Sequence, residues 1–216
     1  MSALDILSLN LSAPDGKVLC RDLSFRVAAG EVLTIMGPSG SGKSSILGWL
    51  TGTLAPGFHA SGEMQLSGRI LNDVPTEKRR LGLMLQQDYL FPHMSVAQNL
   101  KFGLHAGDRR SRDQRVLKSL ESAGLTGLDK RHPTTLSGGQ RSRVSLLRTL
   151  LADPLAVLLD EPFSRLDVTL REQIRQFTWQ ACEQLPVVLV SHDREDIPSG
   201  STVIRLDANG EWQREN

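Results

Sequence analysis

The chain has 216 residues, of which 39% are hydrophobic and 23% are charged. This composition supports a packed core and excludes a disordered chain, and the length fits one domain with room for a subdomain. The net charge of +1 argues against a strongly basic nucleic-acid-binding protein, so we expect no nucleic acid partner.

Two cysteines, Cys20 and Cys182, are too few for a disulfide framework, and we expect them to be reduced and partly buried. The N-terminal segment lacks a basic region followed by a long apolar run, so no signal peptide is expected. No stretch reaches the ~20 apolar residues that cross a bilayer. We therefore expect a soluble cytoplasmic protein that reaches a membrane only through a partner.

The residue pattern of the first half of the chain predicts mainly strands. Alternating apolar residues indicate strands over 4–11 and 22–27, with a turn at 14–17 between them. A mostly apolar strand over 31–37 runs into a glycine-rich loop, and a helix over 44–54 follows. A short hairpin over 62–73 and a buried strand over 80–87 complete this half.

The second half predicts helices that alternate with buried strands. Helical periodicity covers 95–104, 112–125, 141–154 and 168–185, and the third of these helices stops at Pro154. Buried strands are predicted over 155–161 and 186–192, and a hairpin over 201–213 turns at 208–210. Uniformly apolar strands between helices imply an α/β fold, with a parallel sheet covered on both faces.

The glycine-rich loop has the spacing of a P-loop, the Walker A motif. Its glycines allow backbone N–H groups to surround a phosphate, and the following helix directs its positive end to the same place. Lys43 is expected to reach the β- and γ-phosphates, and the Ser44 hydroxyl is expected to hold Mg²⁺. The predicted nucleotide-binding residues here are Gly37, Pro38, Ser39, Gly40, Ser41, Gly42, Lys43, Ser44 and Ser45.

Two acidic residues follow the apolar strand at 155–161. Asp160 fits the Walker B carboxylate that reaches Mg²⁺, and Glu161 is placed to orient or deprotonate an attacking water. Alone, such a pair would indicate solvated acids at the end of a strand, but the upstream P-loop favours the catalytic interpretation. Phosphate binding alone leaves a kinase, a GTPase and an ATPase open, and this strand with its acidic pair narrows the choice.

A third motif is more specific. The sequences LSGGQ (136–140), LLDEP (158–162) and SHD (191–193), in this order, resemble the ATP-binding subunits of ABC transporters, and the resemblance covers nearly the whole chain. It implies a P-loop NTPase (RecA-like) core, an N-terminal antiparallel β subdomain and a small inserted helical subdomain. We therefore expect one ABC ATPase domain over 1–216, with the helical subdomain at about 88–150.

The resemblance assigns roles to further residues. Gln86 matches the glutamine that contacts Mg²⁺ and the attacking water, with Gln87 as the second candidate, and His192 matches the histidine that contacts the γ-phosphate. In the family, two copies pack head to tail around ATP, so each loop of the LSGGQ type closes over the nucleotide of the other copy. The residues implied at that interface are Ser137, Gly138, Gly139, Gln140 and Asp167.

The sequence departs from the family pattern at two places. An aromatic residue that stacks on adenine is expected near Ala13 and Pro14, and none is present. Arg165 replaces a small residue before Asp167; it is either a tolerated surface variant or a charged contact with the second copy. Arg141 and Arg143, which follow the LSGGQ sequence, receive no role beyond contacts within the subdomain.

The sequence favours an importer among the members of the family. The stretch at 88–104 resembles the branch that imports iron, thiamine, sulfate, polyamines or sugars, and Tyr89, Leu90, Phe91 and Met94 are candidates to line a groove for a permease helix. The resemblance implies membrane permease subunits, a substrate-binding protein reached through them, and a peripheral location on the cytoplasmic face of the inner membrane.

Other members of the family remain as alternatives. An exporter subunit shares the same chemistry, and a soluble ABC ATPase without a transport role is the other option. Chromosome-organising types insert a long coiled coil between two points that in this chain, at Gln86 and Ser137, are only 51 positions apart (137 − 86). Translation types carry two cassettes, whereas this chain carries one.

Overall fold

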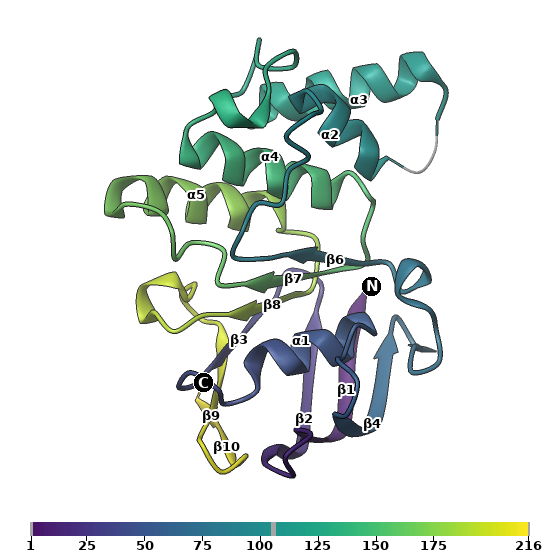
Figure 1. The fold of residues 1–216 in the computed structure, drawn as a ribbon, viewed down its shortest axis with the longest axis vertical. Helices are drawn as coiled ribbons and strands as arrows, with labels where there is room; N and C mark the ends of the chain where they lie inside the picture. The colour runs from purple at the N-terminus through teal and green to yellow at the C-terminus, as the bar shows by residue number, and fades with distance from the viewer. Residues whose placement is uncertain (1, 105–106, 216) are drawn as a thin grey trace. The chain divides into compact units, whose positions relative to one another are not determined.

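The computed structural model describes residues 2–104 and 107–215, which fall into two compact units (Figure 1). The first unit contains the chain up to Leu83, the segment Leu155–Glu161 and the chain from Cys182 onward. The second unit contains Met84–Pro154 and Pro162–Ala181. None of the helices in the described ranges combines the length and the apolar character that a membrane span needs.

A six-stranded sheet forms the centre of the first unit. Its strands are β3 (Val32–Met36), β6 (Leu81–Met84), β7 (Ala156–Asp160), β8 (Val187–Val190), β9 (Thr202–Leu206) and β10 (Trp212–Glu215), in the order β10-β9-β3-β8-β7-β6. The pairs β9–β3, β3–β8 and β8–β7 are parallel, whereas β10 pairs antiparallel with β9. Every residue of β8 is buried, as the uniformly apolar sequence predicts.

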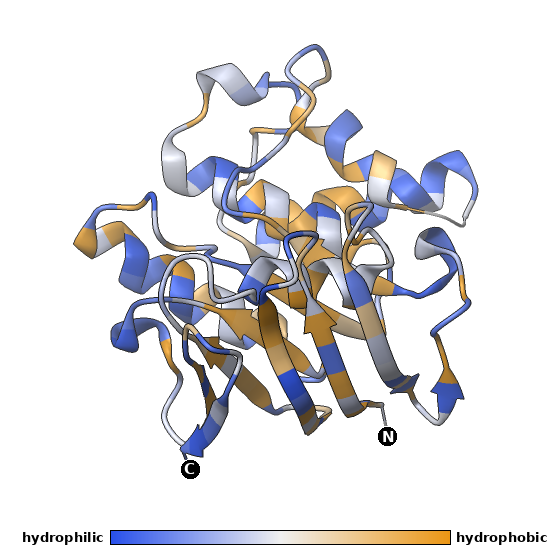
Figure 2. Cartoon of the chain, turned by 60° about the horizontal axis from the view of Figure 1, so that its bottom comes forward, coloured by the Kyte–Doolittle hydropathy of each residue, from blue (hydrophilic) through white to orange (hydrophobic). Residues whose placement is uncertain are grey.

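An antiparallel sheet forms the other layer of this unit. It contains β1 (Ala3–Ser12), β2 (Val18–Ala28), β4 (His59–Leu66) and β5 (Arg69–Ile70), in the order β2-β1-β4-β5. One hydrophobic core joins residues of both sheets with α1 (Lys43–Thr51), which contributes Ile46, Leu47 and Leu50. Figure 2 shows hydrophobic residues along several strands, interrupted by hydrophilic ones. Cys20 and Cys182 are free thiols, and burial raises the pKa of each to about 12.

Buried Arg79 fixes the end of α1. Its guanidinium donates to the carbonyls of Trp49 and Leu50 at 3.0 and 2.7 Å, in the last turn of the helix, where carbonyls lack partners within the helix. It also donates to the carbonyls of Asn72 and Val74 at 3.0 and 2.7 Å, so the chain that follows β5 is tied to the helix. Arg79 follows a short 3₁₀ turn at Thr76–Lys78.

The second unit is helical. It contains α2 (Val96–Gly103), α3 (Arg109–Ser122), α4 (Gly138–Leu150) and α5 (Val168–Ala181), with a 3₁₀ turn at Pro133–Thr135. A separate apolar cluster, which includes Leu100, Leu120 and Val144, forms its core. The buried side chain of Asn99 bonds the backbone of Phe91, Met94 and Ser95, and so fixes the segment before α2.

Each predicted helix ends before the position that the sequence pattern indicates; α2 ends at Gly103, α3 at Ser122 and α4 at Leu150. The helix predicted over 168–185 ends at Ala181, because Cys182–Leu185 forms a turn whose last carbonyl accepts from Gly30 N–H. The helix predicted over 44–54 ends at Thr51, because Gly52 adopts a left-handed conformation with φ 75°. The hairpins predicted over 62–73 and 201–213 are present as β4–β5 and β9–β10, and the latter is preceded by a 3₁₀ turn at Arg194–Asp196.

Candidate functional site

The P-loop lies between β3 and α1. Gly37 has no room for a side chain, since a Cβ there would lie 2.7 Å from the carbonyl oxygen of Leu206 and 2.7 Å from Ser41 Oγ. Gly42 is left-handed with φ 97° and packs against Leu19. The glycines therefore allow the backbone to curl tightly and to present its N–H groups at the start of α1.

Lys43 and Ser41 supply side-chain donors inside this loop. The buried Lys43 ammonium donates to the carbonyls of Gly37 and Pro38 at 2.8 and 2.9 Å, and a third N–H remains for another acceptor. Burial lowers the pKa of Lys43, while the charges of Glu161 and Asp160 oppose that shift. Ser41 Oγ is buried and has no hydrogen-bond partner among the described residues. These donors fit the phosphate groups of a nucleotide.

The acidic pair follows β7 and faces the P-loop within the same unit. Ser44 Oγ donates to Asp160 Oδ2 at 3.3 Å, so a hydroxyl and a carboxylate converge. Burial raises the pKa of the Asp160 carboxyl, while the Ser44 hydrogen bond and the charge of Lys43 lower it. Two oxygen donors of this kind fit the preference of Mg²⁺ for oxygen ligands.

Glu161 and His192 meet at the ends of the adjacent strands β7 and β8. Glu161 has a left-handed backbone with φ 46°, and its N–H donates to the carbonyl of Val190 at 2.9 Å. His192 Nδ1 lies 3.2 Å from Glu161 Oε1, so the ring and the carboxylate orient each other. A non-glycine residue in this conformation is strained, and such residues gather at functional sites.

The signature loop (Ser137–Gln140) opens α4 in the second unit. Ser137 caps the helix: its Oγ accepts from Gln140 N–H at 3.3 Å, and Gln140 Oε1 accepts from Ser137 N–H at 3.0 Å. Gly139 is tightly packed, because a Cβ there would lie 2.4 Å from Leu170 Cδ1. Ser137 is exposed and its O–H remains able to donate, so hydroxyl and backbone donors converge at the positive end of the helix.

Gln86, Gln87 and Asp167 also lie in the second unit. Gln86 is exposed and its Nε2 donates to Ser164 Oγ at 3.1 Å, whereas Gln87 is exposed beside it. Asp167 Oδ1 accepts from Leu170 N–H at 3.0 Å at the start of α5. The structure thus places the P-loop, Asp160, Glu161 and His192 in one unit, and Gln86, Asp167 and the signature loop in the other.

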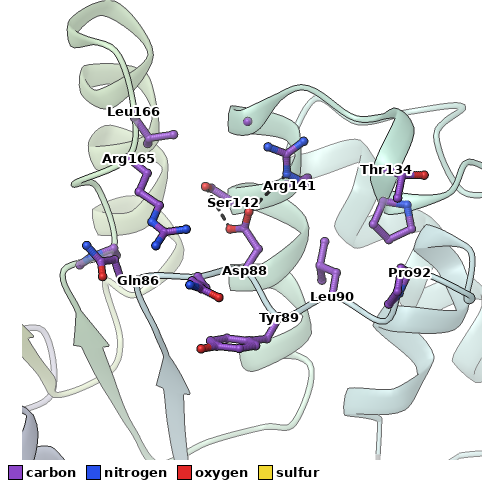
Figure 3. Close-up of a pocket in the computed structure, with 14 residues that line it drawn as sticks. Gln86, Asp88, Tyr89, Leu90, Pro92, Thr134, Arg141, Ser142, Arg165 and Leu166 are labelled. Atoms are coloured by element: carbon purple, nitrogen blue, oxygen red, sulfur yellow. Dashed lines mark hydrogen bonds and ion pairs between the residues drawn. The ribbon is translucent and has the colours of Figure 1, made fainter.

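A cavity of about 440 Å³ lies within the second unit (Figure 3). Of the four residues expected to line a groove for a permease helix, Tyr89 and Leu90 line this cavity, whereas Phe91 and Met94 do not. Phe91 packs edge-on against Phe102 with ring centroids 4.8 Å apart. The lining residues are Gln86, Gln87, Asp88, Tyr89, Leu90, Pro92, Pro133, Thr134, Gly138, Arg141, Ser142, Pro162, Arg165 and Leu166.

The sequence did not single out Lys17, Asp88 or Ser142 for the site, but all three make contacts around it. Lys17 Nζ, in the turn between β1 and β2, donates to the carbonyl of Gly40 at 3.0 Å. Asp88 accepts from Ser142 Oγ at 3.3 Å and pairs with Arg141 at 3.5 Å. Burial raises the pKa of Asp88, against the Ser142 hydrogen bond and the positive charges of Arg141 and Arg165. No local motif marks these contacts, since each joins distant segments.

The arrangement defines a class of protein. A P-loop follows the central parallel strand β3. The acidic pair lies at the end of β7, and only β8 stands between β3 and β7 in the sheet. Ligand sites of open parallel sheets lie outside the carboxyl ends of their strands, and Asp160, Glu161 and His192 gather there. The first unit is therefore the core of a P-loop nucleoside triphosphatase.

Comparison with known sequences identifies the family. Residues 20–164 match the model of a family described as ABC transporter. The chain is 44% identical over 206 residues to the uncharacterised ABC transporter ATP-binding protein YnjD of Escherichia coli (strain K12), and the match covers 94% of each. The chain belongs to the ABC transporter family, and it is an ATPase of that family.

Import proteins are among the relatives. The chain is 40% identical to the spermidine/putrescine import ATP-binding protein PotA of Oleidesulfovibrio alaskensis, over 84% of its own length. It is 38% identical to the Fe(3+) ions import ATP-binding protein FbpC 2 of Haemophilus influenzae, over 89% of its own length. It spans only about half of these two relatives, 49% and 55% respectively.

Solved structures agree with the family. A bacterial ABC transporter cassette solved as a dimer matches with a TM-score of 0.80 at 28% identity, and the match covers 99% of this chain and 98% of that one. The same cassette in a post-hydrolysis state, bound to ADP and Pi, gives the same values. The predicted fold, an α/β P-loop core with an antiparallel β layer and a helical part, is confirmed.

Proposed function

We propose that the chain is the energy-coupling ATPase subunit of a membrane importer and that it works as a homodimer on the cytoplasmic face of the membrane. The import relatives support the direction of transport, and the dimeric cassette supports the pairing. The observation that carries the proposal is the signature loop, which presents hydroxyl and backbone donors at the start of a 13-residue helix. These donors suit a phosphate that a second P-loop holds.

In this proposal the segment Gly37–Ser45 binds the phosphates of ATP, with Lys43 on the β- and γ-phosphates. Ser44, Asp160 and Gln86 are the proposed ligands of Mg²⁺, which when bound neutralises charge on the phosphate oxygens. Lys17 contacts the P-loop and adds positive charge there. It lies in the same turn as Ala13 and Pro14, where the family pattern has an aromatic residue that stacks on adenine.

Glu161 is the proposed general base. Its carboxylate accepts a proton from the attacking water while the water oxygen bonds to the γ-phosphorus and the bond to ADP breaks. His192 Nδ1–H donates to this carboxylate, since a carboxylate can only accept. The γ-phosphate oxygens also only accept, so the proposed contact of His192 with them uses an Nε2 that carries a proton. The bond fixes the orientation of both side chains, and positioning of this kind supplies much of the catalysis in phosphoryl transfer.

The signature loop and Asp167 are proposed to act on the ATP that the second copy holds. Closure is then favoured by ATP, because donors from both copies contact the γ-phosphate, and hydrolysis removes those contacts. This is a shift of population driven by different affinities for the two states. We propose the second unit, including 88–150, as the helical subdomain that carries this loop.

Permease subunits are the proposed membrane partners, and a substrate-binding protein would be reached through them. Tyr89 is 61% exposed and lines the cavity of the second unit, next to Leu90. An exposed aromatic residue at a cavity suits a short apolar helix from a partner. Cargo specificity then belongs to the permease rather than to this chain.

Mixed dimers test whether the site is shared. Lys43→Ala inactivates the P-loop of one copy, and Ser137→Arg blocks the signature loop of the other. A mixed dimer contains one site with both halves intact, so hydrolysis should exceed the sum of the two separate variants. A mixture that never exceeds this sum contradicts the shared site.

A further inference from the structure

Asp88 ties the segment after Gln86 to α4. Its carboxylate accepts from Ser142 and pairs with Arg141, as Figure 3 shows. Its carbonyl accepts from Ser145 Oγ at 3.1 Å and from Arg148 Nη2 at 3.2 Å. The four partners lie along one side of α4, since residues about four apart share a helix face. The segment and the helix are therefore held together at several points.

Arg141 extends this connection to the signature loop. Its Nη1 donates to the carbonyl of Leu136 at 2.7 Å, while its Nε lies 3.5 Å from Asp88 Oδ2. Leu136 is buried and immediately precedes Ser137. One guanidinium therefore bridges the carboxylate of Asp88 and the peptide that enters the signature loop. Charge-assisted hydrogen bonds of this kind are stronger than neutral ones and fix geometry.

We propose that the Asp88–Arg141 pair is a positioning device that couples the segment after Gln86 to the signature loop and sets the orientation of Ser137. The inference rests on the proposed sharing of sites between two copies. It follows that Asp88 serves the ATP held by the other copy and not the ATP held by its own P-loop. A positioned donor loses much of its effect when it is displaced by about 1 Å.

Two variants separate this role from a general loss of structure. Asp88→Asn keeps the size and a hydrogen bond for Ser142 but removes the charge that holds Arg141, and Arg141→Gln removes the other partner. Each should lower hydrolysis at saturating ATP about tenfold and leave the ATP affinity of the single chain unchanged. The double variant should be no worse than either one, because both act through one contact.

Asp153→Asn is the matched control. Asp153 pairs with Arg115 at 2.8 Å on the surface of the same unit, and its left-handed backbone, with φ 49°, accepts asparagine. This variant should hydrolyse ATP at the wild-type rate. Asp88→Glu, which keeps the charge, should recover part of the activity lost in Asp88→Asn.

Mixed dimers locate the defect. Differently tagged Asp88→Asn and Lys43→Ala copies form one site from the P-loop of the first and the signature loop of the second. If Asp88 acts through the signature loop, this site is intact, and hydrolysis should exceed the sum of the separate variants. Asp88→Asn mixed with Ser137→Arg should gain nothing, because both signature loops are impaired. Arg141→Gln should behave as Asp88→Asn does in both mixtures.

Three results would overturn the inference. The first is a wild-type rate in both Asp88→Asn and Arg141→Gln. The second is a mixture of Asp88→Asn and Lys43→Ala that gains no hydrolysis, while the mixture of Ser137→Arg and Lys43→Ala does gain it. Asp88 would then act on the ATP of its own copy, through Gln86. The third is no recovery in the Ser137→Arg reference itself, which would contradict the shared site, and the inference would fall with it.

Discussion

At the scale of single residues, the proposed chemistry depends on side chains at the ends of two adjacent strands. Glu161 directly follows β7 in a left-handed conformation, and its partner His192 follows β8. The backbone hydrogen bond from Glu161 to Val190 joins the two strand ends, so the backbone that carries the Glu161 carboxylate is held in place. The general-base assignment therefore makes a direct prediction for a variant that keeps the shape of the side chain.

Glu161→Gln should keep ATP binding and lower hydrolysis by roughly 10²–10⁴-fold, since an amide cannot accept the proton of the attacking water. Phosphate release measures the rate, and titration with a fluorescent ATP analogue measures binding. Unchanged hydrolysis in this variant would remove Glu161 from the reaction.

The sequence predicted some of these residues and missed others for a physical reason. The residues of the P-loop and the acidic pair stand in short local patterns, and their neighbours along the chain dictate their conformation. Asp88 and Arg141 belong to different segments, and only the packing of α4 brings them together. Arg141 therefore received no specific role from the sequence, although it contacts the peptide before Ser137.

At the scale of elements, α1 carries Lys43 and Ser44, so its stability bears on the site. Arg79 is 7% exposed and supplies the donors that end this helix and hold Asn72 and Val74. Burial lowers the pKa of Arg79, against the charge of Asp73, as expected for a cation removed from water. Loss of one partner from a buried network leaves carbonyls unpaired, which is costly.

Arg79→Met should lower the free energy of unfolding by about 3 kcal/mol or more, because several charge-assisted hydrogen bonds disappear together. Urea denaturation measures this loss. The control is Lys78→Met, an exposed neighbour in the 3₁₀ turn, which should change the free energy by less than about 0.5 kcal/mol. Equal effects of the two changes would contradict the role of Arg79.

The elements themselves were predictable in type and less so at their ends. The apolar runs of β7 and β8 and the periodicity of α4 gave the correct elements, since a buried strand and an amphipathic helix differ in repeat. Apolar residues continue beyond α5 to Leu185, but Pro186 disfavours a helical conformation at the residue before it. The end of α5 at Ala181 is set by this turn and its bond to Gly30.

At the scale of the whole molecule, the sequence carries two loops suited to phosphate, one in each unit. The proposal assigns the P-loop to the ATP of its own copy and the signature loop to the ATP of a second copy. The order of the motifs predicted the family. It did not predict the place of Arg165, which lines the cavity of the second unit and whose positive charge acts to lower the pKa of Asp88.

The most direct test is sedimentation velocity of Glu161→Gln with and without ATP. The proposal predicts a monomer without ATP and a dimer with ATP, because ATP is retained and bridges both copies. Glu161→Gln with Ser137→Arg should stay monomeric at an unchanged ATP affinity. The matched variant with Ser122→Arg, an exposed serine at the end of α3, should still dimerise. ATP-dependent dimers that persist when Ser137→Arg is present would contradict the account.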